Sequence, residues 1–272
     1  MLKCLNPGAI GIRNASLQQT LDLAKGAGFD AIDFSIAEIA RAVNSDGLDA
    51  VKAMFQAAGV QLGCFPLPVA WRGEEPQYRE QLAALPALAN LAVALGCNRC
   101  NSGIGPASDT LPFNENLAWH ISRLRPVAQA LADAGCRLGL EFLGPKHFRA
   151  GRKYEFIYTM HGALDFGKKV GTGNVGLLLD AWHLYTSGGT TADLSGITNA
   201  DVVTVHVNDA PAGIAIDDQR DNVRCLPMET GVIDLVGFMR ALAQAGFDGP
   251  VVVEPFSARV NAMPPEQATA AA

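Results

Sequence analysis

Four apolar stretches of the sequence each end in a side chain that can bind a cation or carry a proton. A carboxylate or an imidazole buried alone among apolar residues is destabilising, but its burial is tolerated when it binds a cation or pairs with a partner. Three oxygen donors and one histidine suit Mn, which we expect first, or Mg and Co, with Zn or Fe as further options. We therefore predict one divalent metal site, formed by the last residues of Gly139-Leu140-Glu141, Leu178-Leu179-Asp180, Val203-Thr204-Val205-His206 and Val252-Val253-Glu254.

These four side chains can meet only if the elements that carry them end at the same place. A recurring pattern provides such elements: an amphipathic stretch rich in Ala and Leu ends at a glycine and an apolar strand follows, as at Gly28, Gly59, Gly96, Gly135 and Gly246. Glycine just past a helix end supplies the left-handed residue that turns the chain. The pattern predicts eight strands, at Leu2–Asn6, Ala31–Phe34, Val60–Phe65, Asn98–Ser102, Arg137–Phe142, Val175–Asp180, Val202–Asn208 and Val251–Pro255.

Eight strand–helix units in about 250 residues indicate an α/β fold, the (β/α)8 or TIM barrel, in which the carboxyl ends of all strands meet at one face. We predict a single domain over residues 1–272, with the alanine-rich tail, residues 264–272, frayed. The main alternative is an open doubly wound sheet, which needs a glycine-rich phosphate loop after its first strand. Asn6-Pro7-Gly8-Ala9-Ile10-Gly11 matches such a loop poorly.

The composition excludes several classes of protein. Apolar residues make up 49% and charged residues 18% of the chain, which indicates a folded domain with a sizeable core. A net charge of −6 without clustered Lys and Arg argues against a nucleic-acid partner. No apolar run approaches the roughly 20 residues of a membrane span, and the first residues do not resemble a signal peptide. We expect a cytoplasmic protein without a membrane partner.

The residues around the four strand ends resemble the xylose-isomerase-like barrels, a family that includes sugar and inosose isomerases, ketose 3-epimerases and relatives of metal-dependent abasic-site endonucleases. The resemblance covers nearly the whole chain, from Leu21 to Phe256. It implies that Glu141, Asp180, His206 and Glu254 hold the metal and that the two glutamates flank the reacting carbon. Its sharpest motifs are Leu140-Glu141-Phe142, Asp180-Ala181-Trp182-His183, Val205-His206-Val207-Asn208-Asp209 and Val253-Glu254-Pro255-Phe256.

Further residues are candidates for substrate binding. The resemblance implies that His183 contacts a substrate oxygen and that Arg224, in a loop after the His206 strand, binds substrate or stabilises the enolate. This loop departs from the family pattern, because Met228 stands where glycine is usual and residues 210–222 lengthen it. Lys146 and His147 follow Glu141 in the same loop and could contact substrate or donate a proton. Trp71 follows the third strand and could form a wall of the pocket.

We predict an isomerase or epimerase of a free sugar or keto-inositol that transfers a proton through a metal-stabilised enediolate. The alternative on the same scaffold is a lyase that removes water or an aglycone from a 3-keto sugar. An abasic-site endonuclease is disfavoured by the acidic charge, and a non-catalytic sugar-binding barrel is the remaining option. The expected partner is a small sugar or polyol, and association into a homo-oligomer is possible for such barrels.

Overall fold

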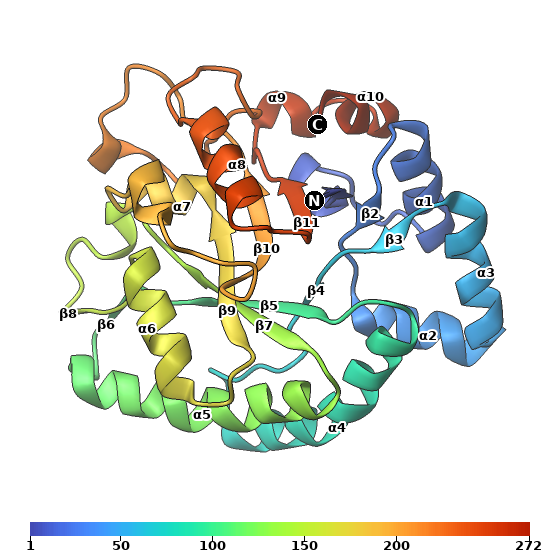
Figure 1. Cartoon of the computed structure of the whole chain (residues 1–272), viewed down its shortest axis with the longest axis horizontal. Coiled ribbons are helices and arrows are strands. Elements are labelled where there is room, and N and C mark those ends of the chain that lie inside the picture. The colour runs from blue at the N-terminus through green and yellow to red at the C-terminus, as the bar shows by residue number, and fades with distance from the viewer.

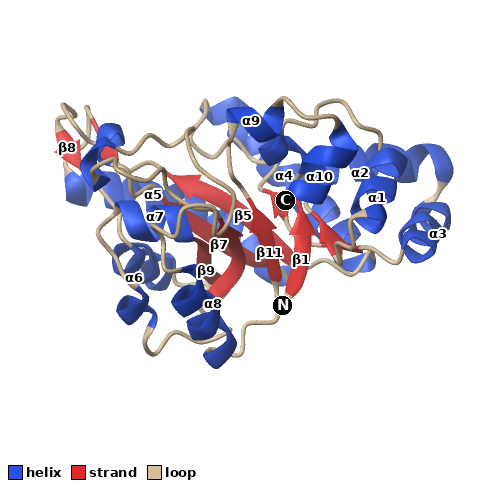
Figure 2. Cartoon of the chain, turned by 90° about the horizontal axis from the view of Figure 1, so that it is seen from above, coloured by secondary structure: helices blue, strands red, loops and turns tan.

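The computed structural model describes residues 1–272 as an α/β domain, with parallel strands inside and helices outside (Figures 1 and 2). The strands of the main sheet lie in the order β3-β2-β1-β11-β10-β9-β7-β5-β4. The two ends of this order, β3 and β4, are halves of one extended stretch and together form the third strand of the barrel. The sheet therefore closes on itself, and the predicted eight-stranded barrel is confirmed. The bounds are β1 Leu2–Leu5, β2 Ala31–Ile32, β3 Gln61–Leu62, β4 Phe65–Pro66, β5 Arg99–Ile104, β7 Arg137–Phe142, β9 Val175–Asp180, β10 Val202–Val207 and β11 Pro250–Val253.

The third strand of the barrel changes its hydrogen-bonding partner at Gly63, so that β3 pairs with β2 and β4 pairs with β5. The N–H of Gly63 donates to Ile32 O at 2.8 Å on one side, and the N–H of Leu67 donates to Asn101 O at 2.8 Å on the other. A Cβ atom on Gly63 would lie 2.5 Å from the sulfur of Cys4. A side chain at this position would collide with Cys4 of β1 and crowd the carbonyl of Ile32 on β2, so the close approach of the strands here favours glycine.

Ten α-helices cover the barrel or follow its last strand. Ser16 and Gln19 form a capping box at the start of the first of them, which satisfies backbone donors that the helix leaves free. Four short 3-10 helices lie in the connections, and β6 Ala107–Ser108 pairs with β8 Tyr154–Glu155 outside the barrel. The α-helices are α1 Leu17–Gly26, α2 Ile36–Asp46, α3 Leu48–Ala58, α4 Glu75–Ala94, α5 Phe113–Asp133, α6 Met160–Val170, α7 Ala181–Thr186, α8 Leu235–Gln244, α9 Ala258–Asn261 and α10 Pro265–Ala271.

The prediction that residues 264–272 fray is wrong. Residues 265–271 form α10, which lies beside α1 near the start of the barrel (Figure 2). Ala268 and Thr269 are buried, and the Thr269 hydroxyl donates to Pro265 O at 2.7 Å. Proline in the first turn has the backbone angle that a helix needs, and small alanines pack closely, so a segment of low complexity still forms an ordered helix.

One apolar core of 56 buried residues joins the outer face of the staves to the helices. The long helices α4 and α5 pack on each other and on this core, and each has a proline inside it. Neither they nor the shorter helices have the length and apolar character of a membrane-spanning segment.

Candidate metal centre

The structure brings Glu141, Asp180, His206 and Glu254 together at the carboxyl end of the barrel. They come from β7, β9, β10 and the residue after β11, which are four consecutive neighbours in the sheet. His206 is in register with Asp180 on one side and with Val252 on the other. Each residue offers one ligand atom, and these four atoms all lie within 4.8 Å of one another.

Asp180 is the most firmly held of the four side chains. It is fully buried, and its Oδ1 accepts hydrogen bonds from the N–H of Trp182 at 2.8 Å and from the side-chain amide of Asn208 at 2.9 Å. Asp180 therefore ends its strand and caps the start of α7 with the same carboxylate. Its Oδ2 remains directed at the centre of the cluster.

Arg224 enters the cluster from the long loop after β10. Its Nη1 lies 2.8 Å from Asp180 Oδ2 and 2.9 Å from Glu254 Oε2, and its Nη2 donates to Asp221 Oδ1 at 2.8 Å. The guanidinium is almost fully buried and lies near the rings of Trp182 and Phe256. The structure thus places Arg224 on two of the candidate metal ligands, and its role toward substrate stays a prediction.

The loop that carries Arg224 is anchored by Asp209. The carboxylate of Asp209 accepts four backbone N–H bonds, from Ala210, Thr230, Gly231 and Ile233, at 2.7 to 3.0 Å. Its backbone also pairs with Cys225 in both directions. These bonds join both ends of residues 210–230, so a long connection still delivers a fixed side chain to the site.

Burial and like charge shift the pKa values of the cluster. Burial, and then the neighbouring carboxylate of Glu254, raises the pKa of Glu141 to about 8. Burial alone would lower the pKa of His206, but the carboxylates around it, led by Glu254, outweigh burial and raise it to about 10. Burial opposes ionisation of Asp180 too, yet the charge of Arg224 holds its pKa below the usual range. Without a cation, this cluster therefore retains protons.

These residues fit a divalent cation. Both ring nitrogens of His206 are buried and neither makes a hydrogen bond of acceptable geometry, although Nδ1 lies 3.2 Å from Glu254 Oε2. A buried imidazole whose nitrogens make no hydrogen bond, beside three carboxylates, is an arrangement that proteins seldom leave unsatisfied. A cation bound by all four side chains would use the free nitrogen and offset the repulsion between the carboxylates.

His183 lies beside the four ligands. Its Nδ1 accepts the N–H of Gly144 at 3.3 Å, so the proton of the neutral ring belongs on Nε2. This Nε2 lies 3.8 Å from Glu141 Oε1, Asp180 Oδ2 and Asp221 Oδ1. Burial lowers the pKa of His183 to about 4, which keeps the ring neutral. The ring is therefore oriented as a hydrogen-bond donor toward the centre.

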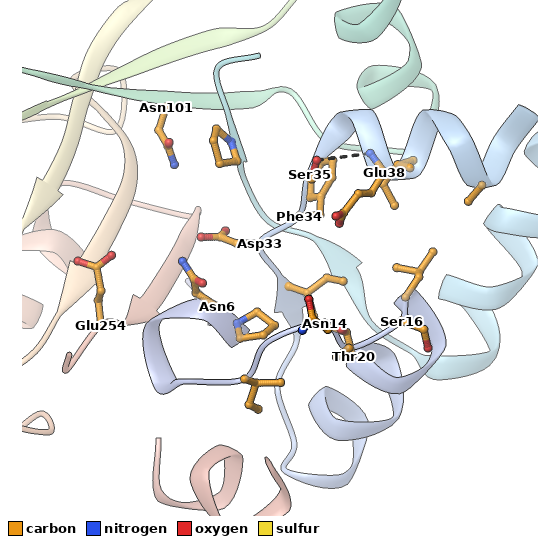
Figure 3. Close-up of a pocket in the computed structure, with 18 of the residues that line it drawn as sticks. Asn6, Asn14, Ser16, Thr20, Asp33, Phe34, Ser35, Glu38, Asn101 and Glu254 are labelled. Atoms are coloured by element: carbon orange, nitrogen blue, oxygen red, sulfur yellow. Dashed lines mark hydrogen bonds between the residues drawn. The ribbon is translucent and has the colours of Figure 1, made fainter. Parts of the chain in front are cut away.

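A cavity of about 860 Å³ opens from the cluster toward α1 and α2 (Figure 3). Glu141, His206 and Glu254 line its inner end. The other lining residues belong mainly to the first four staves and the loops that follow them, and include Asn6, Asn14, Asp33, Phe34, Glu38 and Asn101.

None of the five residues predicted to contact substrate lines this cavity: His183 and Arg224 lie against the candidate ligands, and the other three lie elsewhere. Trp71 is buried in the core, where its Nε1 donates to Ser102 Oγ at 2.9 Å. Lys146 is exposed and pairs with Asp217 at 2.5 Å. His147 packs on Phe148, with 4.2 Å between ring centroids. A position shortly after a strand end does not determine whether a side chain faces the barrel axis, the helices or solvent.

Several residues of the site are missing from the sequence prediction. Asn6 and Asp33 each follow a strand directly and Asn101 lies on a strand, and all three line the cavity. Asp221, in the long loop after β10, is mostly buried beside Arg224. The rule that gave the candidate metal ligands, a polar residue at a strand end, would have found Asn6 if applied to all eight predicted strands, but not Asp33, because the second predicted strand ends at Phe34.

The chain has relatives along nearly its whole length. It is 22% identical to an inosose isomerase of Halalkalibacterium halodurans, over 98% of this chain and 92% of that protein. It is 29% identical to a 3-dehydroshikimate dehydratase of Pseudomonas aeruginosa, over 52% of this chain and 21% of that protein.

Solved structures share the fold. A xylose isomerase domain protein of Alicyclobacillus acidocaldarius superimposes with a TM-score of 0.87 and 33% identity, over 98% of this chain and 94% of that one. The IOLI protein, solved with a zinc atom, gives a TM-score of 0.80 and 22% identity, over 100% of this chain and 95% of that one. The family model for xylose isomerase-like TIM barrels matches residues 21–272. The chain belongs to the xylose isomerase-like TIM barrel family.

Proposed function

We propose that the protein is a divalent-metal-dependent isomerase or epimerase of a sugar or keto-inositol. The observation that carries the proposal is the convergence of four ligand atoms within 4.8 Å, with both nitrogens of His206 lacking hydrogen bonds. The inosose isomerase that matches 98% of this chain supports the class of reaction. In this proposal Glu141, Asp180, His206 and Glu254 hold the metal.

Glu141 and Glu254 are the residues proposed to move the proton. Both line the inner end of the cavity, and each has an oxygen near His206, at 3.8 Å for Glu141 and 3.2 Å for Glu254. One carboxylate removes a proton from the carbon next to the substrate carbonyl, and the other returns a proton. A bound divalent cation would stabilise the negative charge that develops on the substrate oxygens.

His183 and Arg224 have supporting roles in this scheme. The Nε2–H of His183 is directed toward the ligands and can donate to a substrate oxygen, which orients the carbonyl. Arg224 positions the carboxylates of Asp180 and Glu254 through its Nη1. We propose that it also contacts substrate when the carboxylates bind the metal.

We propose Mn as the metal, with Mg, Co, Zn or Fe as alternatives. Three carboxylates and one imidazole favour a cation that prefers oxygen ligands. The related IOLI structure was solved with zinc, so the identity of the cation needs direct measurement.

A lyase is the second candidate. It is favoured by the relative named 3-dehydroshikimate dehydratase and by the long loop over the site. The same proton abstraction leads to elimination when a leaving group stands one carbon further from the carbonyl. The two reactions therefore differ in what the substrate carries and in where the second proton goes.

The test combines metal analysis of the purified protein with product analysis. The metal-loaded protein is incubated with a panel of ketoses, inososes and 3-keto glycosides, in water and in deuterium oxide. Rearranged isomers that carry solvent deuterium at the reacting carbon support the proposal, whereas an unsaturated product supports the lyase. A protein that binds no divalent metal, or that exchanges no carbon-bound proton in any of these compounds, contradicts both.

A further inference from the structure

We propose that Asp33 is a specificity-determining residue: its carboxylate accepts hydrogen bonds from the hydroxyl groups of an uncharged polyol and repels substrates that carry a carboxylate or a phosphate. The inference rests on the proposed function, because it assigns a substrate class to the same cavity. It concerns the end of the substrate that lies away from the metal ligands.

Asp33 faces the cavity from the end of β2, which β1 separates from β11, the strand before Glu254. It follows β2 directly, and its backbone N–H donates to Leu5 O at 2.9 Å, which fixes where its side chain begins. In Figure 3 the side chains of Asp33, Asn6, Asn101 and Glu254 surround the same space. A ligand that reaches from Glu254 into the cavity therefore meets Asp33.

The carboxylate of Asp33 is poorly satisfied within the protein. Its hydrogen-bond donors are the thiol of Cys4, with 3.4 Å between Sγ and Oδ1, and the backbone N–H of Cys64, and a thiol is a weak donor. No Lys, Arg or His side chain lies within ion-pair distance of it, in contrast to Asp180. A half-buried carboxylate has about four acceptor positions, so about half of those on Asp33 remain free for a ligand.

The two neighbouring amides complement this acceptor. Asn6 uses its side-chain oxygen to accept the N–H of Ala9 at 3.3 Å, and its amide nitrogen makes no bond within the protein. Asn101 donates only to the sulfur of Cys64, at 3.3 Å. A hydroxyl group both donates and accepts, so adjacent hydroxyls on one ring or chain can donate to Asp33 while they accept from the amide groups.

The charges along the cavity favour a neutral substrate. The acidic side chains that line it are Asp33, Glu38, Glu141 and Glu254. Besides His206, its one basic side chain is Arg41, which is exposed at the outer rim and lies 3.7 Å from Glu38. A cation at the cluster would compensate Glu141 and Glu254. The positive group near Asp33 is His206 of the same cluster, and no Lys or Arg side chain pairs with Asp33. An anionic group at that end would therefore be repelled at short range.

The experiment measures binding of two probes to the metal-loaded, full-length protein by titration calorimetry. The probes are myo-inositol, a neutral cyclic polyol, and shikimate, a cyclic polyol with a carboxylate. Neither has a ketone, so binding is measured without turnover, and a failed isomerase assay leaves this test intact. The variants are Asp33→Asn and a matched control, Glu38→Gln, which removes a carboxylate from the rim of the same cavity.

We expect the wild-type protein to bind myo-inositol more tightly than shikimate. Asp33→Asn should weaken myo-inositol binding about tenfold or more, because a hydrogen bond to a charged group is lost, and it should strengthen shikimate binding. Glu38→Gln should change both affinities less than about twofold. The proposal is overturned if the wild type prefers shikimate or binds neither probe, or if both variants behave alike.

A structural role for Asp33 would produce a different result. A second variant, Asp33→Ser, keeps a small polar group, and both Asp33 variants are compared with wild type for thermal unfolding and for affinity toward the metal alone. Unchanged metal affinity with reversed probe preference supports the proposal. Loss of metal affinity in both Asp33 variants contradicts it, because Asp33 would then act through the metal site.

Discussion

The two sides of the barrel differ in how firmly they hold their side chains. On one side β7, β9 and β10 span six residues each and pair along much of their length. On the other side β2, β3 and β4 span two residues each, and the third stave changes partner at Gly63. The first side carries three of the four candidate metal ligands, and the second, together with β1 and the segment that follows it, lines most of the cavity.

This difference separates two requirements of an enzyme. Ligands of one cation must be held to within a fraction of an ångström, and long ladders with shared register provide that precision. Selection of a substrate needs space and adaptable polar groups, which short strands and the loops after them provide. We call the side with β7, β9 and β10 the long-strand side and the side with β2, β3 and β4 the short-strand side. We therefore expect the chemistry to depend on the long-strand side and the choice of substrate to depend on the short-strand side.

The largest effect is expected from Glu254→Gln. The substitution keeps the shape of the side chain but removes both a metal ligand and a proton acceptor, so kcat should fall about 10²- to 10⁴-fold. The measurement is steady-state turnover on whichever ketose or inosose proves active, with circular dichroism to confirm folding. Glu80→Gln, on the exposed face of α4, is the matched control and should retain full activity. A comparable loss of kcat in Asp33→Asn would contradict the division between the two sides.

Metal binding should stabilise the protein. A ligand that binds only the folded state at a concentration one hundred times its dissociation constant adds about 2.7 kcal/mol. Thermal unfolding with and without Mn²⁺, after treatment with a chelator, should show this increase in wild type and in Asp33→Asn. Asp180→Asn should lose most of it, because it removes the charge of a fully buried ligand. Equal stabilisation of both variants would place the cation elsewhere.

The sequence is sufficient to predict the barrel and the convergence of the four candidate metal ligands because both depend on local patterns. Glycine after each amphipathic stretch marks where strands begin, and Glu141, Asp180, His206 and Glu254 each interrupt an apolar run. The barrel geometry then brings these strand ends together. Each predicted strand overlaps an observed one, although the second stave pairs over only two residues.

The remaining features depend on contacts between distant parts of the chain. Arg224 meets Asp180, 44 residues earlier, only because Asp209 anchors the loop that carries it. Trp71 is directed into the core by the packing of α5, which no pattern near residue 71 describes. Asp33 follows such a short strand that it resembles an ordinary turn residue. Loop conformation and side-chain direction therefore could not be inferred from spacing.

A substitution at Asp209 tests the stability of the long-strand side without changing any of the four candidate metal ligands. Four backbone N–H donors outweigh burial and hold the pKa of Asp209 below its usual range. A lowered pKa in the folded state stabilises the protein above the unfolded value of about 3.9, and this contribution is lost as the pH falls through the folded value. At pH 7 we expect Asp209→Asn to unfold about 2 kcal/mol more easily than wild type.

The measurement is urea unfolding of both proteins at several pH values, with a chelator present. The difference in free energy of unfolding should be greatest near neutral pH and should shrink as the pH falls below about 4. Asp218→Asn changes an exposed carboxylate of the same loop and should have almost no effect at any pH. A difference between wild type and Asp209→Asn that grows toward acid would show that the sign of the effect is wrong.

The smallest effect is expected on the short-strand side, at Trp71. Trp71→Phe removes the hydrogen bond from Nε1 to Ser102 but retains an aromatic ring against His120, at a centroid distance of 5.1 Å in wild type. Loss of one such bond costs about 1 kcal/mol, which urea unfolding can detect. Because Trp71 does not line the cavity, KM should remain within about twofold of wild type. A rise in KM with unchanged stability would show instead that Trp71 contacts substrate. The region that binds substrate would then extend beyond the cavity, toward α4.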